Sequence, residues 1–562
     1  MGAAVAPVDP VRRLHAEAMQ AERAGKPDAA ARAYRRLLQL KPDHAETHNN
    51  LGRVLHLQGK PRDASQHFAR SLMLMPQAFD QYASICATLI SLMPPLGAAM
   101  RTAAQAWPQR PGIDTLFGPG EFDIVASDPL LVCVLQATPV RDVAFERLLT
   151  SLRAALLADA IAGKTASDSM LAFACALARQ CFINEYVFAT TPEEDAQAAR
   201  LIGALDTGAD IATFALAAAA TYMPLSILPA AEQLLGRTWP PAVDDLLTQH
   251  LRDRAQEREL RATMPRLTAI EDEVSQRVRQ QYEENPYPRW VHVAGAVEAV
   301  PIDLYIRSLF PTTPFTPIGK SGPLDVLVAG CGTGWHAIGI TQKLSDAAAL
   351  AVDLSLASLA YAKRSTPDAL KAQVNYAQAD ILKLDNIEQR FDVIDASGVL
   401  HHMADPWQGW RTLIGMLRPG GLMHLGLYSD AGRQDVVAAR AFIAERGYDA
   451  TPAEIRRCRQ DLLQTPMRSL TRFTDFFTTS ECRDLLFHVQ ETRVTIPAIK
   501  DFLAASGLRF LGFEFGAAPQ QEHRALFSSS GWSLTDLDRW HALETAHPQL
   551  FSSMYHFWVQ KD

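Results

Sequence analysis

A strand that ends in a glycine-rich turn limits the possible folds of this chain more than anything else in its sequence. Residues 325–334 read DVLVAGCGTG, and the breaker SGP stands just before them at residues 321–323. The apolar, Val- and Leu-rich run is typical of a central parallel strand that is covered on both faces. Glycines at 330, 332 and 334 let the backbone turn tightly and approach a ligand without Cβ atoms in the way. The stretch predicts a doubly wound α/β domain with a nucleotide-type ligand at the carboxyl end of this strand.

The chain downstream supplies the other segments that such a domain needs. Residues 348–352 form a second apolar strand that ends in Asp353, 19 residues after Gly334. A carboxylate at this place can accept two hydrogen bonds from ribose hydroxyls. The later segments are the step ADI at residues 379–381, an apolar strand at 391–396, the step VLHH at 399–402 and the turn RPGG at 418–421.

In this order the motifs resemble those of the class I S-adenosylmethionine (SAM) methyltransferases. The resemblance covers roughly residues 301–562 and implies a seven-stranded sheet with an antiparallel last strand, and SAM as the cofactor. It also implies that the glycine loop lies against the methionine part, that Asp353 holds the ribose, and that Asp380 and Ile381 frame the adenine. The full set of cofactor residues that it implies is Gly330, Cys331, Gly332, Gly334, Asp353, Leu354, Asp380, Ile381 and Ser397.

The chain departs from the family pattern at one position. Many members carry an acidic residue two positions before the first glycine, where this chain has Val328. We therefore expect another polar group to contact the methionine amino group. The alternative to a methyltransferase, a dinucleotide-binding domain, expects the pattern GxGxxG, in which the third glycine comes one residue later than here.

Four residues are candidates for catalysis: Tyr282, Tyr287, His401 and His402. His401 follows the strand beside which the acceptor lies in this fold, and a neutral imidazole can take a proton from an ammonium or a hydroxyl group. The step VLHH also occurs in methyltransferases with quite different substrates. A structural histidine that binds backbone is therefore the alternative for this position.

Asn285, Arg289 and His488 are candidates for substrate binding. No metal site is expected, because two histidines adjacent in sequence are poorly placed to share one ion. The sequence also lacks an NPPY element, which argues against methylation of nucleic-acid bases.

Near the N-terminus, four pairs of residues lie 34 positions apart and indicate tetratricopeptide (TPR) repeats. The pairs are Gly25 with Gly59, Ala30 with Ala64, Tyr34 with Phe68, and Pro42 with Pro76. Residues 79–92 resemble a third, degenerate or capping helix pair. The alternative is a simple helical hairpin packed on its neighbour. Because fewer than three full repeats rarely stand alone, we expect the repeats to dock on the next domain.

A rigid aromatic loop precedes the predicted methyltransferase domain. A polar helix over residues 268–281 leads into YEENPYPRW at 282–290, where two prolines fix φ and favour extended backbone at the residues before them. Similar NPYPRW segments precede the methyltransferase domain in bacterial TPR–methyltransferase fusions, where they would lie across the mouth of the cofactor pocket. An aromatic clasp that joins two domains is the alternative.

Composition points to a soluble, cytoplasmic protein. The net charge of −8 argues against a general nucleic-acid partner, although residues 1–77 are net basic. Seven scattered cysteines without a CxxC pair indicate reduced thiols. Residues 1–10 lack a signal-peptide pattern. The apolar stretch at 213–231 contains two prolines, so we expect a buried helix there and no membrane span.

Together these observations predict a multidomain chain with an all-α N-terminal half and an α/β C-terminal part. The predicted parts are TPR-like repeats at 1–94, an all-helical middle domain at 95–280, an aromatic linker or lid at 281–300, and a seven-stranded methyltransferase domain at 301–562 with a helical insertion at about 431–500. The predicted function is SAM-dependent methylation of a protein or peptide substrate that the helical half recruits. The alternatives are a small-molecule or natural-product methyltransferase whose TPR docks a partner, and an interaction scaffold with an inactive methyltransferase fold.

Overall fold

A computed structural model describes most of the chain, in two compact units. The described residues are 9–75, 87–205, 211–229, 231–293, 298–320, 322–515, 533–551 and 553–562. The first unit comprises Met1–Arg254 with Trp290–Gly295, and the second comprises Ala255–Arg289 with Ala296–Asp562.

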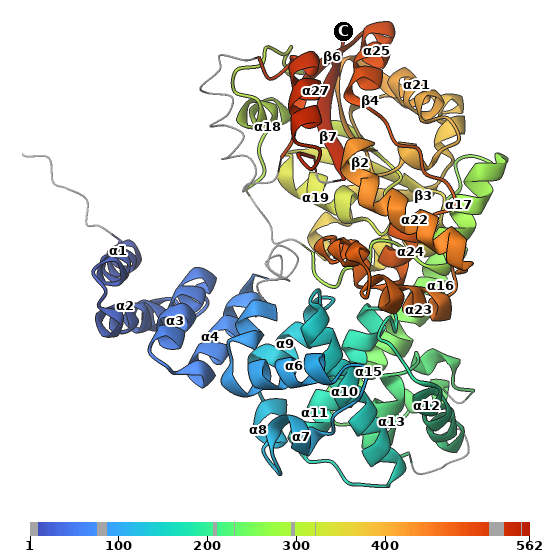
Figure 1. Cartoon of the computed structure of the whole chain (residues 1–562). Coiled ribbons are helices and arrows are strands. Elements are labelled where there is room, and N and C mark those ends of the chain that lie inside the picture. The colour runs from blue at the N-terminus through green and yellow to red at the C-terminus, as the bar shows by residue number, and fades with distance from the viewer. Residues whose placement is uncertain are drawn as a thin grey trace, which may run out of the picture. The chain divides into compact units, whose positions relative to one another are not determined.

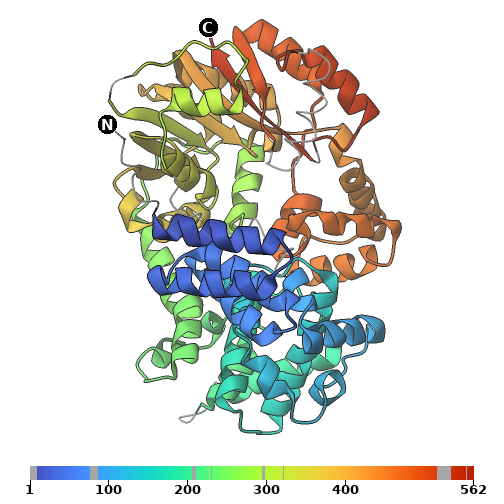
Figure 2. The same cartoon turned by 90° about the vertical axis from the view of Figure 1, so that its left-hand side faces the viewer.

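The first unit begins with two helical hairpins that have the predicted 34-residue period. Their helices are α1 (Pro10–Arg23), α2 (Pro27–Leu40), α3 (Ala45–Leu57) and α4 (Pro61–Leu74) (Figures 1 and 2). Ala30, Ala64, Tyr34 and Phe68 are buried between them, so the repeated positions are packing positions. The predicted third helix pair, at 79–92, and Pro76 lie largely outside the described residues.

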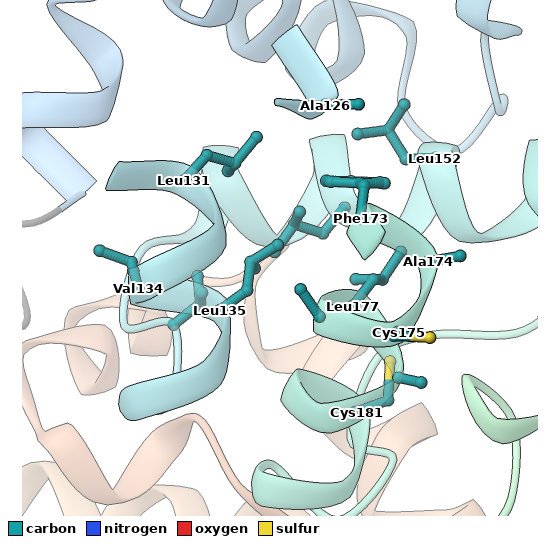
Figure 3. Packing of buried hydrophobic residues seen from close by; sticks show 14 of the residues in the cluster. Ala126, Leu131, Val134, Leu135, Leu152, Phe173, Ala174, Cys175, Leu177 and Cys181 are labelled. Atoms are coloured by element: carbon teal, nitrogen blue, oxygen red, sulfur yellow. The ribbon is translucent and has the colours of Figure 1, made fainter. Parts of the chain in front are cut away.

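The rest of the first unit is also helical. A tightly packed apolar core joins its longest helices, and free cysteines such as Cys175 and Cys181 lie inside this core (Figure 3). The stretch at 213–231 forms a short buried helix, as expected, and no helix in the described part of the chain is long and apolar enough to cross a membrane. The helices are α6 (Pro94–Ala106), α7 (Ile113–Phe117), α8 (Phe122–Ala126), α9 (Pro129–Ala137), α10 (Val143–Ile161), α11 (Asp168–Ile183), α12 (Pro192–Leu205), α13 (Thr213–Ala220), η1 (Leu225–Ile227), α14 (Ala231–Leu234), α15 (Pro241–Leu247), the π-helical turn η2 (Thr248–Arg252) and α16 (Asp253–Thr263), which runs on into the second unit.

A seven-stranded sheet forms the centre of the second unit, in the order β3-β2-β1-β4-β5-β7-β6. Strands β1 to β5 are parallel, whereas β7 pairs antiparallel with both β5 and β6, so the predicted antiparallel closing strand is confirmed. The strands are β1 (Leu324–Ala329), β2 (Ala347–Asp353), β3 (Val374–Gln378), β4 (Phe391–Ser397), β5 (Leu417–Tyr428), β6 (Leu508–Phe513) and β7 (Met554–Lys561).

Helices cover both faces of this sheet, which explains why its central strands are apolar throughout. One apolar layer packs β1 and β2 against α18 (Ile302–Leu309), α19 (Trp335–Lys343) and α20 (Leu356–Ser365). The other packs β4, β5 and β7 against α21 (Pro406–Met416), α25 (Ile496–Ser506) and α27 (Leu537–Ala546) (Figure 1).

Two additions flank the carboxyl ends of the strands. One is α17 (Glu273–Glu284) and the aromatic loop after it, and the other is the helical insertion, with α22 (Gln434–Arg446), α23 (Pro452–Leu462) and α24 (Thr479–Phe487). Arg483 of α24 donates hydrogen bonds to Glu284 (2.7 Å) and Asn285 (2.6 Å), so the two additions are joined. The remaining short 3₁₀ turns are η3 (Asp368–Leu370), η4 (Ile381–Asn386), η5 (Leu400–His402), η6 (Ala431–Arg433), η7 (Pro466–Arg472) and η8 (Thr474–Phe476).

Candidate active site

A cavity of about 240 Å³ lies at the carboxyl ends of β1, β2 and β4 in the second unit. Eight of the nine residues that we expected to bind the cofactor line it: Gly330, Cys331, Gly332, Asp353, Leu354, Asp380, Ile381 and Ser397. Of the candidate catalytic residues, Tyr282, Tyr287 and His402 also line it. The structure therefore brings residues more than 100 positions apart to one site.

The glycine loop is held by close backbone contacts. A Cβ atom on Gly332 would lie 2.6 Å from the carbonyl oxygen of Tyr287, and φ at Gly332 is +50°. Thr333 donates its backbone N–H to that same oxygen (3.3 Å). Gly334 does not line the cavity, and a Cβ there would lie 2.7 Å from Cβ of Ala362 in α20. Glycine is thus required at position 332 because the aromatic loop packs against it. Glycine is required at position 334 because α20 packs against it.

Asp353 ends β2 and lines the cavity. Its carboxylate accepts the backbone N–H groups of Gly332 and Ser355, each at 2.8 Å. Burial raises the pKa of Asp353 to about 6, although these two hydrogen bonds act in the opposite direction. The carboxylate is therefore ionised at neutral pH, and its remaining lone pairs can accept hydroxyl donors.

Asp380, just after β3, gives the cavity a second buried carboxylate. Its Oδ1 caps η4 by accepting Leu382 N–H (3.0 Å), and its own N–H donates to Thr268 (2.8 Å). The other oxygen, Oδ2, is buried and has no well-formed hydrogen bond among the described residues, although the nearby Ser275 hydroxyl acts to lower the pKa of this carboxyl. Burial raises the pKa of Asp380. An unsatisfied buried carboxylate oxygen in a cavity is costly, and the exocyclic amine of adenine is a donor that would satisfy it.

The position of Val328 has a charged neighbour on the adjacent strand. Val328 of β1 pairs in register with Asp395 of β4. Asp395 is buried, and its Oδ2 lies 3.5 Å from Nδ1 of His336 and 3.1 Å from Nδ1 of His424. Despite the burial, these two histidines hold the pKa of Asp395 well below its usual range. His336 lines the cavity. Asp395 and His336 therefore place two polar side chains near Val328, the position at which an acidic residue was expected.

The aromatic loop closes one side of the cavity. The rings of Tyr282 and Tyr287 are stacked, with centroids 6.4 Å apart. Thr333 donates its hydroxyl to the carbonyl of Pro288, and Ser355 donates its hydroxyl to the carbonyl of Tyr282 (3.0 Å). These bonds fix the loop on the glycine loop and on the end of β2, which makes it a wall of the cavity.

His402 lines the cavity together with Tyr282 and belongs to a buried network with the insertion. Its ring stacks on His488 at a centroid distance of 3.6 Å, and its Nδ1 lies 2.9 Å from the carbonyl oxygen of Gln490. Tyr282 donates its hydroxyl to Asp484 Oδ1 (2.5 Å), and the Tyr428 hydroxyl reaches Oδ2 (3.4 Å). The neighbouring Arg433 lies with its guanidinium 3.6 Å from the Tyr428 ring centre.

The other candidate residues have different surroundings. His401 is buried outside the cavity, and its ring stacks on Tyr428 at 3.6 Å. Asn285 accepts a hydrogen bond from Arg483, Arg289 is buried with its guanidinium 5.9 Å from the Tyr361 ring centre, and His488 lies behind His402. None of these four lines the cavity.

One cluster has the composition of a metal site. His402, Asp484 and His488 bring potential ligand atoms within 4.8 Å of one another. However, Nδ1 of His488 accepts the backbone N–H of Gln490 (3.0 Å), which places the proton of the neutral ring on Nε2. Because a protonated nitrogen cannot bind a metal, the hydrogen bonding of His488 opposes metal binding at Nε2.

Several lining residues were not expected from the sequence. They are Asp272, Ser275, Trp335, His336, Met403, Met554 and His556. Trp335 and His336 directly follow Gly334, and Met403 directly follows the VLHH step, so adjacency to a motif was the available signal for these three. The place of Met554 and His556 depends on β7 pairing with β5, which no local pattern specifies.

Comparisons with known proteins agree with this geometry. Residues 326–421 match the family model of a methyltransferase domain, and residues 21–89 match that of the tetratricopeptide repeat. The chain therefore combines tetratricopeptide repeats with a methyltransferase domain.

Individual relatives match this chain only in part. An uncharacterized protein of Synechococcus sp. is 27% identical over 303 residues, which are 50% of this chain and 71% of that protein. The 27-O-demethylrifamycin SV methyltransferase of Amycolatopsis mediterranei is 33% identical over 105 residues, 18% of this chain and 37% of that enzyme. PKMT2 from Rickettsia typhi, solved in complex with AdoHcy, is 17% identical with a TM-score of 0.37, over 46% of this chain and 52% of that chain. The chain thus spans about half the length of that structure.

Proposed function

We propose that this protein transfers a methyl group from SAM to a protein or peptide substrate that the TPR-bearing unit recruits. The observation that supports methyl transfer best is a single cavity with two parts. In one part, Asp353 can accept hydrogen bonds from ribose hydroxyls and Asp380 can accept one from the adenine amine. The other part is lined by aromatic side chains, among them Tyr282 and His402. These two acceptors fit SAM, because Oδ2 of Asp380, which has no well-formed hydrogen bond among the described residues, can accept one from the adenine amine.

The chain's residues have mainly a positioning role in this reaction. SAM supplies an electrophilic methyl group, and transfer is an in-line displacement that depends on orientation and on exclusion of water. The loop with Tyr287, held by Thr333, forms a wall over the glycine loop. We call the part of the cavity beside Tyr282 and His402 the acceptor side, because the methyl acceptor would lie there. Its lining is largely apolar and includes Met403, Met554 and the two tyrosines.

Recruitment of a macromolecule rests on the TPR repeats. Stacked helix pairs present an extended surface that suits a peptide, and the repeats here belong to the net basic start of an acidic chain. Binding energy from such a remote surface should lower KM for a large acceptor without changing SAM affinity.

A small-molecule acceptor is the second candidate, and one observation favours it. The acceptor side is walled by α17, the aromatic loop and η5, so a small aromatic or apolar molecule would be well enclosed. In that case the repeats would dock a partner protein rather than the substrate.

Labelling a cell extract separates these two candidates. Extract of the source cells, with or without prior protease treatment, is incubated with the full-length protein and SAM that carries a tritiated methyl group. We expect label in macromolecules that disappears after protease treatment, and much less label with an Asp353→Asn control at a low SAM concentration. Label that survives protease treatment in small molecules would favour the second candidate, and no label in either fraction would contradict the proposal.

A further inference from the structure

The hydrogen bonds around His402 fix which of its nitrogens is protonated. Nδ1 lies 2.9 Å from the carbonyl oxygen of Gln490, and a carbonyl only accepts, so Nδ1 carries the proton. Nε2 of the neutral ring then carries no proton and has a lone pair that can accept one. Nε2 is also the nitrogen that lies 4.0 Å from Oδ1 of Asp484. His402 lines the cavity together with Tyr282.

The groups behind His402 form a chain with one consistent set of protons. Gln490 N–H donates to Nδ1 of His488 (3.0 Å), so Nε2–H of His488 donates to the Tyr282 hydroxyl oxygen (3.2 Å). The Tyr282 hydroxyl in turn donates to Asp484 (2.5 Å). Every proton of this chain points toward Asp484, which therefore acts as its acceptor and carries the negative charge.

The charge states agree with this order. Burial lowers the pKa of His402 to about 4 and raises the pKa of Asp484 to about 6, and the hydroxyl donor Tyr282 partly offsets the burial of Asp484. At neutral pH a neutral imidazole thus stands beside a buried carboxylate. The titratable or charged groups that face His402 are Asp484 and His488 from α24 and its end, Tyr282 from α17, Tyr428 from β5, His401 from its own turn, and Glu491, Arg433 and Arg440 from the insertion.

The lining residues that the structure describes at the acceptor side include no carboxylate that could hold an ammonium ion. Among the described lining residues there, Tyr282, Tyr287, Met403 and Met554 are uncharged, and burial lowers the pKa of His556 to about 3. Asp484 does not line the cavity and lies behind Tyr282 and His402. The site therefore suits an acceptor that enters as a neutral group.

From this geometry we propose that the acceptor is a hydroxyl group, phenolic or alcoholic, whose proton passes to Nε2 of His402 while Asp484 stabilises the resulting imidazolium. This inference rests on the proposed function. The new bond joins the acceptor oxygen to the methyl carbon, the carbon–sulfur bond breaks with its electron pair going to sulfur, and the hydroxyl proton goes to His402. The products are a methyl ether and S-adenosylhomocysteine (SAH), and no further reactant is needed. Asp484 is a positioning residue, since it acts through His402.

The first test reads the protonation of His402 directly, without turnover. Full-length protein with ¹⁵N-labelled histidine is studied with SAH by long-range ¹H–¹⁵N correlation, and the signal of His402 is assigned by its loss in His402→Gln. We expect a protonated Nδ1 and a bare Nε2 at pH 7, and a ring that stays neutral down to pH 5. A protonated Nε2 at pH 7 would overturn the inference.

The second test identifies the methylated atom. The labelled product from the extract experiment is treated with hot hydriodic acid, which releases methyl iodide from methyl ethers but leaves N-methyl groups at moderate temperature, and separately with mild alkali, which cleaves methyl esters. We expect release by the acid and stability to alkali. Label that stays on nitrogen, or that alkali removes, would overturn the hydroxyl assignment.

Variants then separate this inference from the proposed function. His402→Gln should lower label incorporation about a hundredfold, since general base catalysis contributes about 10²–10⁴. Asp484→Asn should lower incorporation less, about tenfold, and both variants should bind SAH as the wild type does. Free imidazole should partly restore His402→Ala, and the exposed His541→Gln is the matched control. Full incorporation by His402→Gln would refute the role of His402, whereas a wild type that binds no SAH would refute the proposed function itself.

Discussion

The pH dependence of SAH binding tests the role of Asp353 with the fewest assumptions. Two ribose hydroxyls need an ionised acceptor, and both oxygens of Asp353 already accept one backbone N–H each. Because the pKa of Asp353 is about 6, affinity should be present above this pH and be lost as the pH falls through it. The carboxylate fraction falls from about nine tenths at pH 7 to about one tenth at pH 5, so affinity should fall about tenfold.

Replacement of Asp353 by asparagine should remove this dependence. The amide keeps the shape of the side chain, but a hydrogen bond to a charged acceptor contributes about 1.5–3 kcal/mol, so SAH affinity at pH 7 should fall about tenfold to a hundredfold. Between pH 7 and pH 5 the variant should then show little further loss. Asp385→Asn, at an exposed position of η4, is the matched control.

Isothermal titration calorimetry from pH 5 to pH 7.5 measures both effects, with circular dichroism to check folding. The free protein should not lose stability in acid through Asp353. Its folded pKa lies above the usual 3.8, so its contribution to stability falls as the pH rises from about 4 to 6, not as the pH drops. Wild-type affinity that stays flat over this range in a folded protein would refute the reasoning, as would an unchanged pH dependence in Asp353→Asn.

Three further predictions concern the walls of the cavity. Gly332→Ala should lower both the melting temperature and SAH affinity, because its Cβ would lie 2.6 Å from a carbonyl oxygen. The control Gly339→Ala, in open space on α19, should lower neither. Equal melting temperatures of the two variants would contradict this packing. Tyr287→Ala should lower the melting temperature by roughly 5 °C, because truncation of a packed aromatic side chain costs about 3 kcal/mol. If the ring only forms a wall, Tyr287→Phe should keep both stability and turnover. Reduced turnover of Tyr287→Phe at unchanged stability would show that the Tyr287 hydroxyl contacts the acceptor. His336→Ala should lower the affinity for SAH about tenfold in calorimetry. The affinity for 5′-methylthioadenosine, which lacks the amino-acid end, should not change. An equal loss of affinity for both ligands would show that His336 does not contact the amino-acid end.

The fold was predictable because its signals are local and come in a fixed order. The strand at 325–329, the glycine loop and Asp353 each depend on residues close together in sequence, and the parallel sheet follows from the repeated strand pattern. The TPR period was visible for the same reason. The start of the polar helix was less well defined: it runs over Glu273–Glu284, whereas the sequence suggested 268–281.

The acceptor side could not be predicted in the same way. Asp484 meets Tyr282 across 202 positions of sequence, and only the packing of the insertion brings them together. Likewise, nothing in VLHH tells which histidine faces the cavity, because the 3₁₀ turn at Leu400–His402 turns one ring toward Tyr428 and the other toward the cavity. The register of β1 and β4, which sets Asp395 beside Val328, is also a tertiary property.

A crystal structure of the full-length protein with SAH tests the central claim most directly. The account predicts the adenine amine at Oδ2 of Asp380, both ribose hydroxyls at Asp353, the amino-acid end along the glycine loop, and the thioether sulfur facing the side that His402 and Tyr282 line. SAH bound elsewhere, or with its sulfur turned away from His402, would contradict the account.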